Sequence, residues 1–572
     1  MNKSFLALCI AASLTLASAA QAADVRMLNV DAAGVGLNDA TPVAPVGGNP
    51  GTTRGEQARY VYQFAMDMWG GVLESPVTIN VQASFAPLAC TASSGTLASA
   101  GTSTVLTGTI GARPARSYGS ALVDAISGYD VIEDIYGSAY AGYPDIVSQF
   151  NGKLGQTGCL DGMSWYFGLD GATPAGQVNF LNVVMHEIGH GLGVQGFLNR
   201  TTTSANFGAN SYSAIDVFTA NAYDNVINKP FSAMTPLERK AALLAPGRTV
   251  WTGANVNSQA PSALNSRYGL RASAPAAIAG LNYEIGFAAF GPLVSPANFP
   301  DRELVLINDG NIGAGTATDG CSANGAATTN GDTITYVNAA AVAGKVAVID
   351  RGTCSFEYKS RIAQDNGAVG VIIVNNAAGV IDMAVGAVRT SVSIPTLMVS
   401  QADGAQIKAN IAGARAGVLA SSGLLAGADN SGRVRLYTPA TYAPGSTFSH
   451  FDTALTPNAL MEPFDTPEVQ GQFNVDLTPG VFADIGWTLN PGNGKIVGCD
   501  TGVDAVANAG IVLGANVQAT NNLCKTSAGR RTDYTACMYN YRDDMRADGL
   551  LNSSQTLKLN TCIKKQSDQF GR

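Results

Sequence analysis

Residues 180–193 read FLNVVMHEIGHGLG, and the interpretation of the whole chain starts from this stretch. The apolar residues before His186 predict a largely buried helix. Side chains four residues apart lie on the same face of a helix, so His186 and His190 can bind one zinc ion. Glu187 would then lie beside a water on the metal. A helical histidine pair can also simply face solvent, but the apolar surroundings disfavour that alternative.

A catalytic zinc ion usually has three protein ligands and a water, so a third ligand has to come from elsewhere in the chain. Gly193 stands where metzincin proteases have the glycine of the pattern H-E-x-x-H-x-x-G-x-x-H. A glycine there lets the helix end sharply. Gly196 occupies the position of the last histidine, so the short form of that pattern is incomplete.

The remaining histidine of the chain, His450, lies in the string GSTFSHFD (445–452), which is followed by NALMEP (458–463) and FADIGW (482–487). These strings resemble the leishmanolysin branch of the metzincins, in which a long insertion precedes the third histidine. The resemblance implies that His186, His190 and His450 bind zinc and that Glu187 is the general base. It also implies that Met461 forms the Met-turn beneath the metal.

Two alternatives to this assignment stay open at the level of sequence. A carboxylate such as Asp216 or Glu238 could complete the site, with His450 an ordinary loop residue. Met461 could be a core residue, because methionine commonly fills gaps in protein interiors.

Residues 191–449 separate the second histidine from the third, which is too long for a loop without structure of its own. Short apolar strands alternate with helices in this stretch, a pattern typical of an α/β unit. The strings GKVAVIDRGTCSF (344–356), AVGVIIVNN (368–376) and SIPTLMVS (393–400) closely resemble the protease-associated (PA) domain. In that family the domain is non-catalytic and accompanies a peptidase.

The N-terminus reads as a secretory signal peptide, with Lys3, an apolar run and an A-x-A pattern at residues 20–22. Eight cysteines follow it, and an even number in an exported protein indicates disulfides. We expect Cys90 to pair with Cys159, Cys321 with Cys354, and two bridges to form among the last four. Those four are Cys499, Cys524, Cys537 and Cys562. The absence of a C-x2-C pair disfavours a zinc–thiolate site.

Composition excludes several classes of protein. The chain has 34 basic and 42 acidic residues, a net charge of −8, and 46% hydrophobic residues. A disordered chain needs lower hydrophobicity and higher net charge. A nucleic-acid-binding protein needs a basic surface to neutralise phosphates, so we expect no such partner. No apolar stretch is long enough to span a membrane.

The sequence therefore predicts an α+β protein with a metzincin-like catalytic domain, an inserted α/β PA domain and a small disulfide-containing C-terminal module. The expected divisions are residues 1–22, 23–275, 276–425, 426–490 and 491–572. The expected activity is that of a secreted zinc endopeptidase, extracellular or periplasmic, with one catalytic zinc ion and protein or peptide substrates. A non-catalytic binding protein and a zinc hydrolase of other substrates are the alternatives. No EF-hand spacing supports a calcium site, and the oligomeric state stays open.

Overall fold

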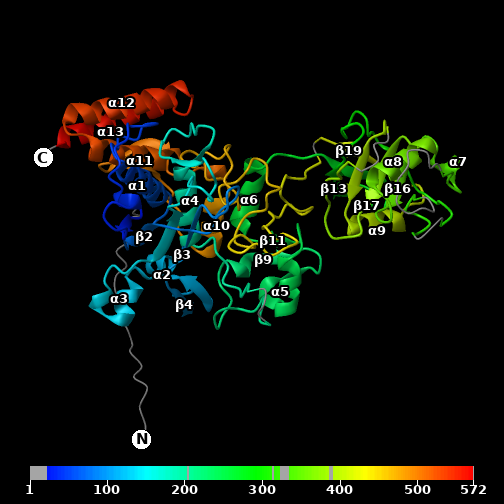
Figure 1. Ribbon diagram of the computed structural model, residues 1–572, viewed down its shortest axis with the longest axis horizontal. Helices are drawn as coiled ribbons and strands as arrows, with labels where there is room; N and C mark the ends of the chain where they lie inside the picture. Colours follow the sequence, from blue (N-terminus) through cyan, green and yellow to red (C-terminus); the bar gives the residue numbers. More distant parts are fainter. Residues whose placement is uncertain are drawn as a thin grey trace, which may run out of the picture.

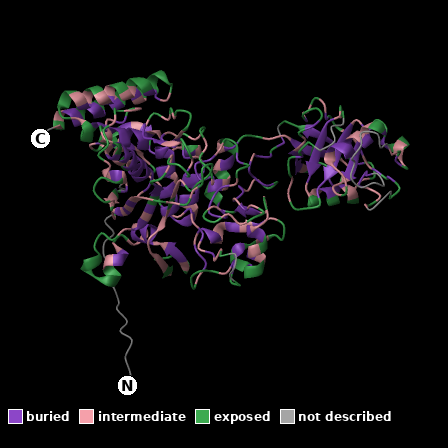
Figure 2. Ribbon diagram, in the orientation of Figure 1, coloured by how far each residue is buried: buried purple, intermediate pink, exposed green. Residues whose placement is uncertain are grey.

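The computed structural model describes residues 22–201, 205–311, 315–321, 334–385, 391–420 and 422–570. The predicted signal peptide lies outside these residues apart from Ala22. Two lobes are visible in Figure 1: a larger one on the left and a smaller one on the right. Buried residues are concentrated in the centre of each lobe (Figure 2), so each has its own hydrophobic core.

A four-stranded sheet and two long helices form the centre of the larger lobe. The strand order is β1-β2-β6-β3, with β1, β2 and β6 parallel and the edge strand β3 antiparallel to β6. Apolar residues recur at helical spacing over 55–74 and alternate over 77–85, which predicts a helix followed by a strand, and α1 and β2 occupy these stretches. These elements are β1 (Val25–Asn29), α1 (Arg54–Val72), β2 (Ile79–Ala86), β3 (Ala98–Thr102), β6 (Ile146–Asn151) and α4 (Phe180–Gly191).

The helix α4 is held deep in the larger lobe by aromatic side chains. The indole of Trp69 on α1 is fully buried and donates a hydrogen bond to the Met185 carbonyl (3.1 Å). Phe180, the first residue of α4, packs edge-on against Phe150 and Trp165 at ring-centroid distances of 5.0 and 5.2 Å. The apolar residues that predicted a buried helix therefore anchor α4 between α1 and the sheet.

Shorter elements complete the larger lobe around this centre. They are β4 (Val105–Gly108), β5 (Arg116–Gly119), α2 (Ser120–Ser127), α3 (Val131–Tyr136), β7 (Ser164–Tyr166), β8 (Gln177–Asn179), β9 (Ala222–Asp224), β10 (Lys229–Pro230), α5 (Pro236–Leu243), β11 (Thr249–Trp251), α6 (Ala254–Ala263) and α10 (Thr478–Ile485).

The smaller lobe is an eight-stranded sheet in the order β13-β12-β19-β15-β16-β17-β18-β14. Val348 on β16 packs into one apolar cluster, whereas its neighbours Ala347 and Ile349 pack into another. Successive strand residues point to opposite faces, so both faces of the sheet are covered. The elements are β12 (Gly269–Ala274), β13 (Asn282–Glu284), β14 (Gly286–Phe287), β15 (Arg302–Leu306), α7 (Ala339–Val342), β16 (Val346–Asp350), α8 (Phe356–Asp365), β17 (Gly370–Val374), β18 (Thr396–Val399), α9 (Gln401–Ala409) and β19 (Arg415–Leu419).

This sheet begins earlier in the chain than the expected boundary at residue 276. The strand β12 pairs antiparallel with both β13 and β19, so it belongs to the smaller lobe. Its pairing partner β19 lies about 140 residues further on, and local sequence does not indicate such a pairing.

The C-terminal segment contains a hairpin and three helices, and it packs directly onto the larger lobe. Ala515 and Ala519 of α11 belong to the core of that lobe, where a Cβ on Gly71 of α1 would lie 2.7 Å from the Ala515 Cβ. The apolar face of α11 therefore joins the expected module to the larger lobe. The elements are β20 (Asn493–Ile496), β21 (Cys499–Asp504), α11 (Leu513–Ser527), α12 (Arg531–Ala547) and α13 (Ser553–Gln569).

The structure contains four disulfides among its described residues. Two of them are the expected pairs Cys90–Cys159 and Cys321–Cys354. In the C-terminal segment, Cys499 pairs with Cys562 and Cys524 with Cys537. Separately, no helix within the described ranges combines the length and the hydropathy that a transmembrane span requires.

The contact between α1 and α11 gives a first prediction. In a Gly71→Val variant, the new side chain has to displace the Ala515 backbone, whose Cα would lie 2.9 Å from the new Cβ. We expect the free energy of unfolding to fall by about 1–3 kcal/mol, measured by chemical denaturation. Gly108→Val is the matched control, because no atom lies within 4 Å of a Cβ at that position. Equal stabilities for the two variants would contradict tight packing of α11 on α1.

Candidate metal centre

The helix α4 presents two histidines to the same side and then ends abruptly. His186 and His190 are one helical turn apart, with ring centroids separated by 4.7 Å. Gly193, two residues beyond the end of α4, has a φ of +124°, and its Cβ would lie 2.5 Å from Ile485. Only glycine meets both conditions at low cost, so Gly193 allows the chain to leave the helix and turn away.

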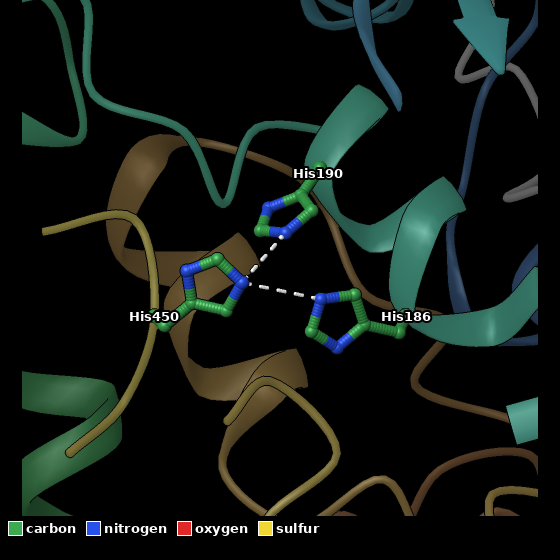
Figure 3. Close-up of side chains that lie close together, drawn as sticks. All are labelled: His186, His190 and His450. Carbon is green, nitrogen blue, oxygen red and sulfur yellow. Dashed lines mark hydrogen bonds between the residues drawn. The ribbon is translucent and has the colours of Figure 1, made fainter. Parts of the chain in front are cut away.

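The third histidine reaches the same place from a segment far along the chain. The loop that carries His450 runs against Gly196, whose N–H donates to the Ser449 hydroxyl (3.2 Å). A Cβ on Gly196 would lie 2.4 Å from the ring of Phe448. The remote segment therefore occupies the space beside the position where a shorter motif has its last histidine. Figure 3 shows the three rings converging from α4 and this loop.

The imidazole nitrogens show which atoms face the centre of the cluster. Each Nδ1 lies 2.7 Å from a backbone carbonyl: Leu460 for His186, Val194 for His190 and Ser446 for His450. A carbonyl can only accept a hydrogen bond, so in each neutral ring Nδ1 carries the proton. All three Nε2 atoms are consequently unprotonated and point inward.

The three Nε2 atoms lie at distances that suit metal coordination. The Nε2 of His450 is 3.1 Å from that of His190 and 3.3 Å from that of His186. Two unprotonated nitrogens cannot hydrogen-bond to each other, so these contacts bring lone pairs together. Zinc–nitrogen bonds of about 2.0–2.1 Å hold two ligands of a tetrahedral site about 3.4 Å apart. Among the described residues, these histidines form one group of metal-ligating side chains.

The surroundings keep the three rings uncharged. Burial lowers the pKa of His186 to about 4 and that of His190 to about 3, and it lowers the pKa of His450 well below its usual value. Neutral imidazoles are the form that binds metal ions. A cation at the centre would relieve the repulsion between the converging lone pairs, so the donor set fits a zinc ion.

Glu187 lies next to the cluster on the inner side of α4. The backbone of Ala100 in β3 lies close enough to favour the charged form of Glu187. One oxygen of the carboxyl group, Oε2, is buried and has no hydrogen-bond partner among the described residues. Burial raises the pKa of Glu187 to about 8 in the protein without a metal ion. The carboxyl group therefore has one buried oxygen available for a new hydrogen bond.

Met461 lies directly beneath α4. It is fully buried, and a Cβ on Gly189 would lie 2.8 Å from its sulfur atom. Gly189 stands between the two helical histidines, so its missing side chain lets the sulfur approach the helix at the cluster. The preceding residue, Leu460, supplies the carbonyl that orients His186.

The two carboxylates that sequence left as alternative ligands have other partners. Asp216 accepts hydrogen bonds from the backbone N–H groups of Phe197 and Thr219. Glu238 caps α5 through Thr235 and pairs with Lys229 at 2.8 Å. Neither belongs to the group formed by the three histidines.

Sequence reasoning missed the residues that hold the three imidazoles in place. Asp476 accepts the Leu460 N–H (2.6 Å) and so helps to fix the residue whose carbonyl bonds to His186. Trp487 donates from its indole to the Leu192 carbonyl (2.8 Å) just after α4. The string FADIGW, which ends at Trp487, can be recognised in the sequence, although its contact with Leu192 cannot. The carbonyl acceptors cannot be recognised, because every residue has a carbonyl group.

Comparison with known protein families identifies the smaller lobe. Residues 291–407 match the family described as "PA domain". The smaller lobe therefore contains a PA domain. The match lies within the smaller lobe and agrees with the strings that suggested it. Four strands, β12, β13, β14 and β19, extend the sheet beyond the matched residues.

Comparison with solved structures gives weaker similarities. A zinc aminopeptidase from Bacillus subtilis is 18% identical over 32% of this chain and 37% of its own, with a TM-score of 0.18. An aminopeptidase from Aneurinibacillus sp. strain AM-1 is 22% identical over 30% of this chain and 38% of its own, also with a TM-score of 0.18. The chain thus spans less than two fifths of the length of these enzymes, and a TM-score of 0.18 does not establish a common fold. A search of curated proteins gives no match.

The cluster geometry gives a second prediction. Replacing His450 with alanine removes one of three converging donors, so we expect zinc affinity to fall by more than about 100-fold. Loss of a residue that merely supports a ligand already costs about 10–100-fold. Competition with a chromophoric chelator measures the change, with Met68→Leu as a control that alters a buried methionine of the same core and leaves all three imidazoles present. Unchanged affinity in His450→Ala would place the third ligand elsewhere.

Proposed function

We propose that this chain is a secreted zinc-dependent endopeptidase of the leishmanolysin-like metzincin type, with a PA domain inserted between its metal ligands. The observation that carries the proposal is the convergence of three unprotonated Nε2 atoms beside a buried carboxylate. His186, His190 and His450 are the proposed zinc ligands, and Met461 is the proposed Met-turn residue. The four disulfides support an oxidising compartment.

In this proposal the chain's own residues prepare the reaction. The three Nδ1–H groups bond to carbonyls, which fixes the ring orientations and leaves Nε2 for the metal. A bound zinc ion supplies Lewis acidity, which acidifies water and polarises a carbonyl group. Glu187 would accept, at Oε2, the proton of the water whose oxygen bonds to the carbonyl carbon as the peptide C–N bond breaks. It then returns that proton to the leaving amine.

The edge strand β3 supports a peptide as the substrate. Ala100 is the middle residue of β3, and its backbone lies close enough to Glu187 to influence its pKa, so this edge of the sheet lies at the candidate site. An extended peptide can pair with an exposed strand edge through main-chain hydrogen bonds.

Exchange of the general base tests the mechanism. The Glu187→Gln variant keeps the shape of the side chain but cannot accept the proton, so we expect kcat to fall by about 10²–10⁴-fold. Zinc content should stay stoichiometric. Glu74→Gln is the matched control, because Glu74 also has a buried oxygen without a partner among the described residues. Activity retained in Glu187→Gln would remove the proposed role.

A second experiment distinguishes an endopeptidase from the alternatives. A peptide that is acetylated at its N-terminus and amidated at its C-terminus has no free end for an aminopeptidase. We expect the protein to cleave internal bonds of this peptide, detected by mass spectrometry, and expect EDTA to stop the reaction. Zinc binding without cleavage of this peptide or of a denatured protein would favour a binding protein or a hydrolase of other substrates.

A further inference from the structure

The PA lobe is joined to the larger lobe by a buried cluster of opposite charges. Glu284 ends β13, an edge strand of the smaller lobe that faces the larger lobe in Figure 1. Its carboxylate bonds to Arg435 through both guanidinium Nη atoms, and one of these bonds measures 2.7 Å. Arg267 donates to the same carboxylate at 2.6 Å. Glu284 and Arg435 are 7% and 8% exposed, so solvent hardly screens their attraction.

Arg435 belongs to a short extended segment, residues 434–438, in the larger lobe. The Trp251 N–H donates to Val434 (2.7 Å), and the Leu436 N–H donates to Thr249 (3.0 Å). The segment therefore pairs with β11 along one side. Its opposite side carries a different partner.

That partner is the backbone of the third histidine. The N–H of Tyr437 donates to the His450 carbonyl (2.9 Å), and the N–H of Asp452 donates to the Arg435 carbonyl (3.1 Å). Leu436 and Phe451 form an antiparallel bridge between these two bonds. The residue that bonds to Glu284 is thus hydrogen-bonded, through its own peptide group, to the segment that carries His450.

The two arginines of the cluster differ in this respect. Arg267 lies just before β12, and its second Nη donates to the Ile285 carbonyl of the smaller lobe (2.7 Å). Its backbone N–H donates to Leu424, outside the 434–438 segment (3.0 Å). Both arginines neutralise Glu284, but it is the backbone of Arg435 that is hydrogen-bonded to the segment carrying His450.

We propose that the Glu284–Arg435 ion pair couples the PA lobe to the metal centre and that Arg435 is a positioning residue for His450. This inference rests on the proposed role of His450 as a zinc ligand. A planar guanidinium that bonds both carboxylate oxygens fixes the direction as well as the distance of its partner. The position of the PA lobe therefore sets the position of the 434–438 segment, and that segment sets the backbone of His450. Zinc affinity then depends on a residue of the inserted domain.

Paired lysine substitutions test this coupling without leaving a buried carboxylate unpaired. Both variants, Arg435→Lys and Arg267→Lys, keep the positive charge. Arg435→Lys loses the two-pronged bond to Glu284, and Arg267→Lys loses the guanidinium that joins Glu284 to the Ile285 carbonyl. We expect zinc affinity, measured by chelator competition, to fall about 10-fold or more in Arg435→Lys and to stay within about 2-fold in Arg267→Lys. In cobalt-substituted protein, the visible absorption bands, which report ligand geometry, should shift in Arg435→Lys only.

Glu284→Gln provides a second variant on the PA side of the contact, with Glu303→Gln as its control. Glu303 pairs with Lys345 within the smaller lobe and is much more exposed. We expect Glu284→Gln to weaken zinc binding and shift the cobalt bands, and Glu303→Gln to change neither. The proposal would be overturned if Arg435→Lys and Glu284→Gln lowered thermal stability but kept the parental zinc affinity and cobalt spectrum. The ion pair would then only stabilise the contact between the lobes.

These readouts separate the inference from the proposed function. They measure metal binding, so they hold whether or not the protein cleaves peptides. If His450→Ala also retains parental zinc affinity, the ligand assignment itself is wrong. If His450→Ala loses zinc while Arg435→Lys and Arg267→Lys behave alike, the assignment stands and the coupling fails.

Discussion

Three unprotonated imidazole nitrogens converge in a buried place, and the rest of the structure serves that convergence. Their lone pairs repel one another, and the low dielectric of the interior strengthens the repulsion. Each ring is held in this tautomer by a carbonyl acceptor behind it. A protein maintains such an arrangement when a cation compensates for it. The geometry of the cluster is therefore the strongest physical argument for a metal centre in this chain.

The centre is assembled from parts of the chain that lie far apart. The helix α4 supplies two of the imidazoles, and the third follows the whole PA lobe in the sequence. Glycines make the junction compact: Gly189 admits the Met461 sulfur, and Gly196 admits the ring of Phe448. A side chain at either position would push the remote segment away from the helix. The cluster thus depends on the absence of side chains as much as on the presence of the histidines.

Much of this arrangement could be predicted from the sequence. The spacing of His186 and His190 follows from helical periodicity, and strands such as β16 and β17 follow from short apolar runs bounded by turn residues. His450 is a candidate because the sequence around it resembles that of a known family and because the chain has three histidines in all. Its approach to the helix depends on long-range packing that no local pattern encodes. For the same reason, local sequence does not show where the lobes begin and end. The strand β12 pairs with a distant strand, and the apolar face of α11 packs into the same core as α1.

Zinc-edge X-ray absorption of the zinc-loaded protein tests the central claim most directly. The account predicts a first shell of oxygen and nitrogen atoms at about 2.0–2.1 Å, with outer-shell scattering that requires three imidazole rings. A spectrum fitted by two imidazoles, by sulfur ligands, or by a shell without imidazole scattering would contradict it.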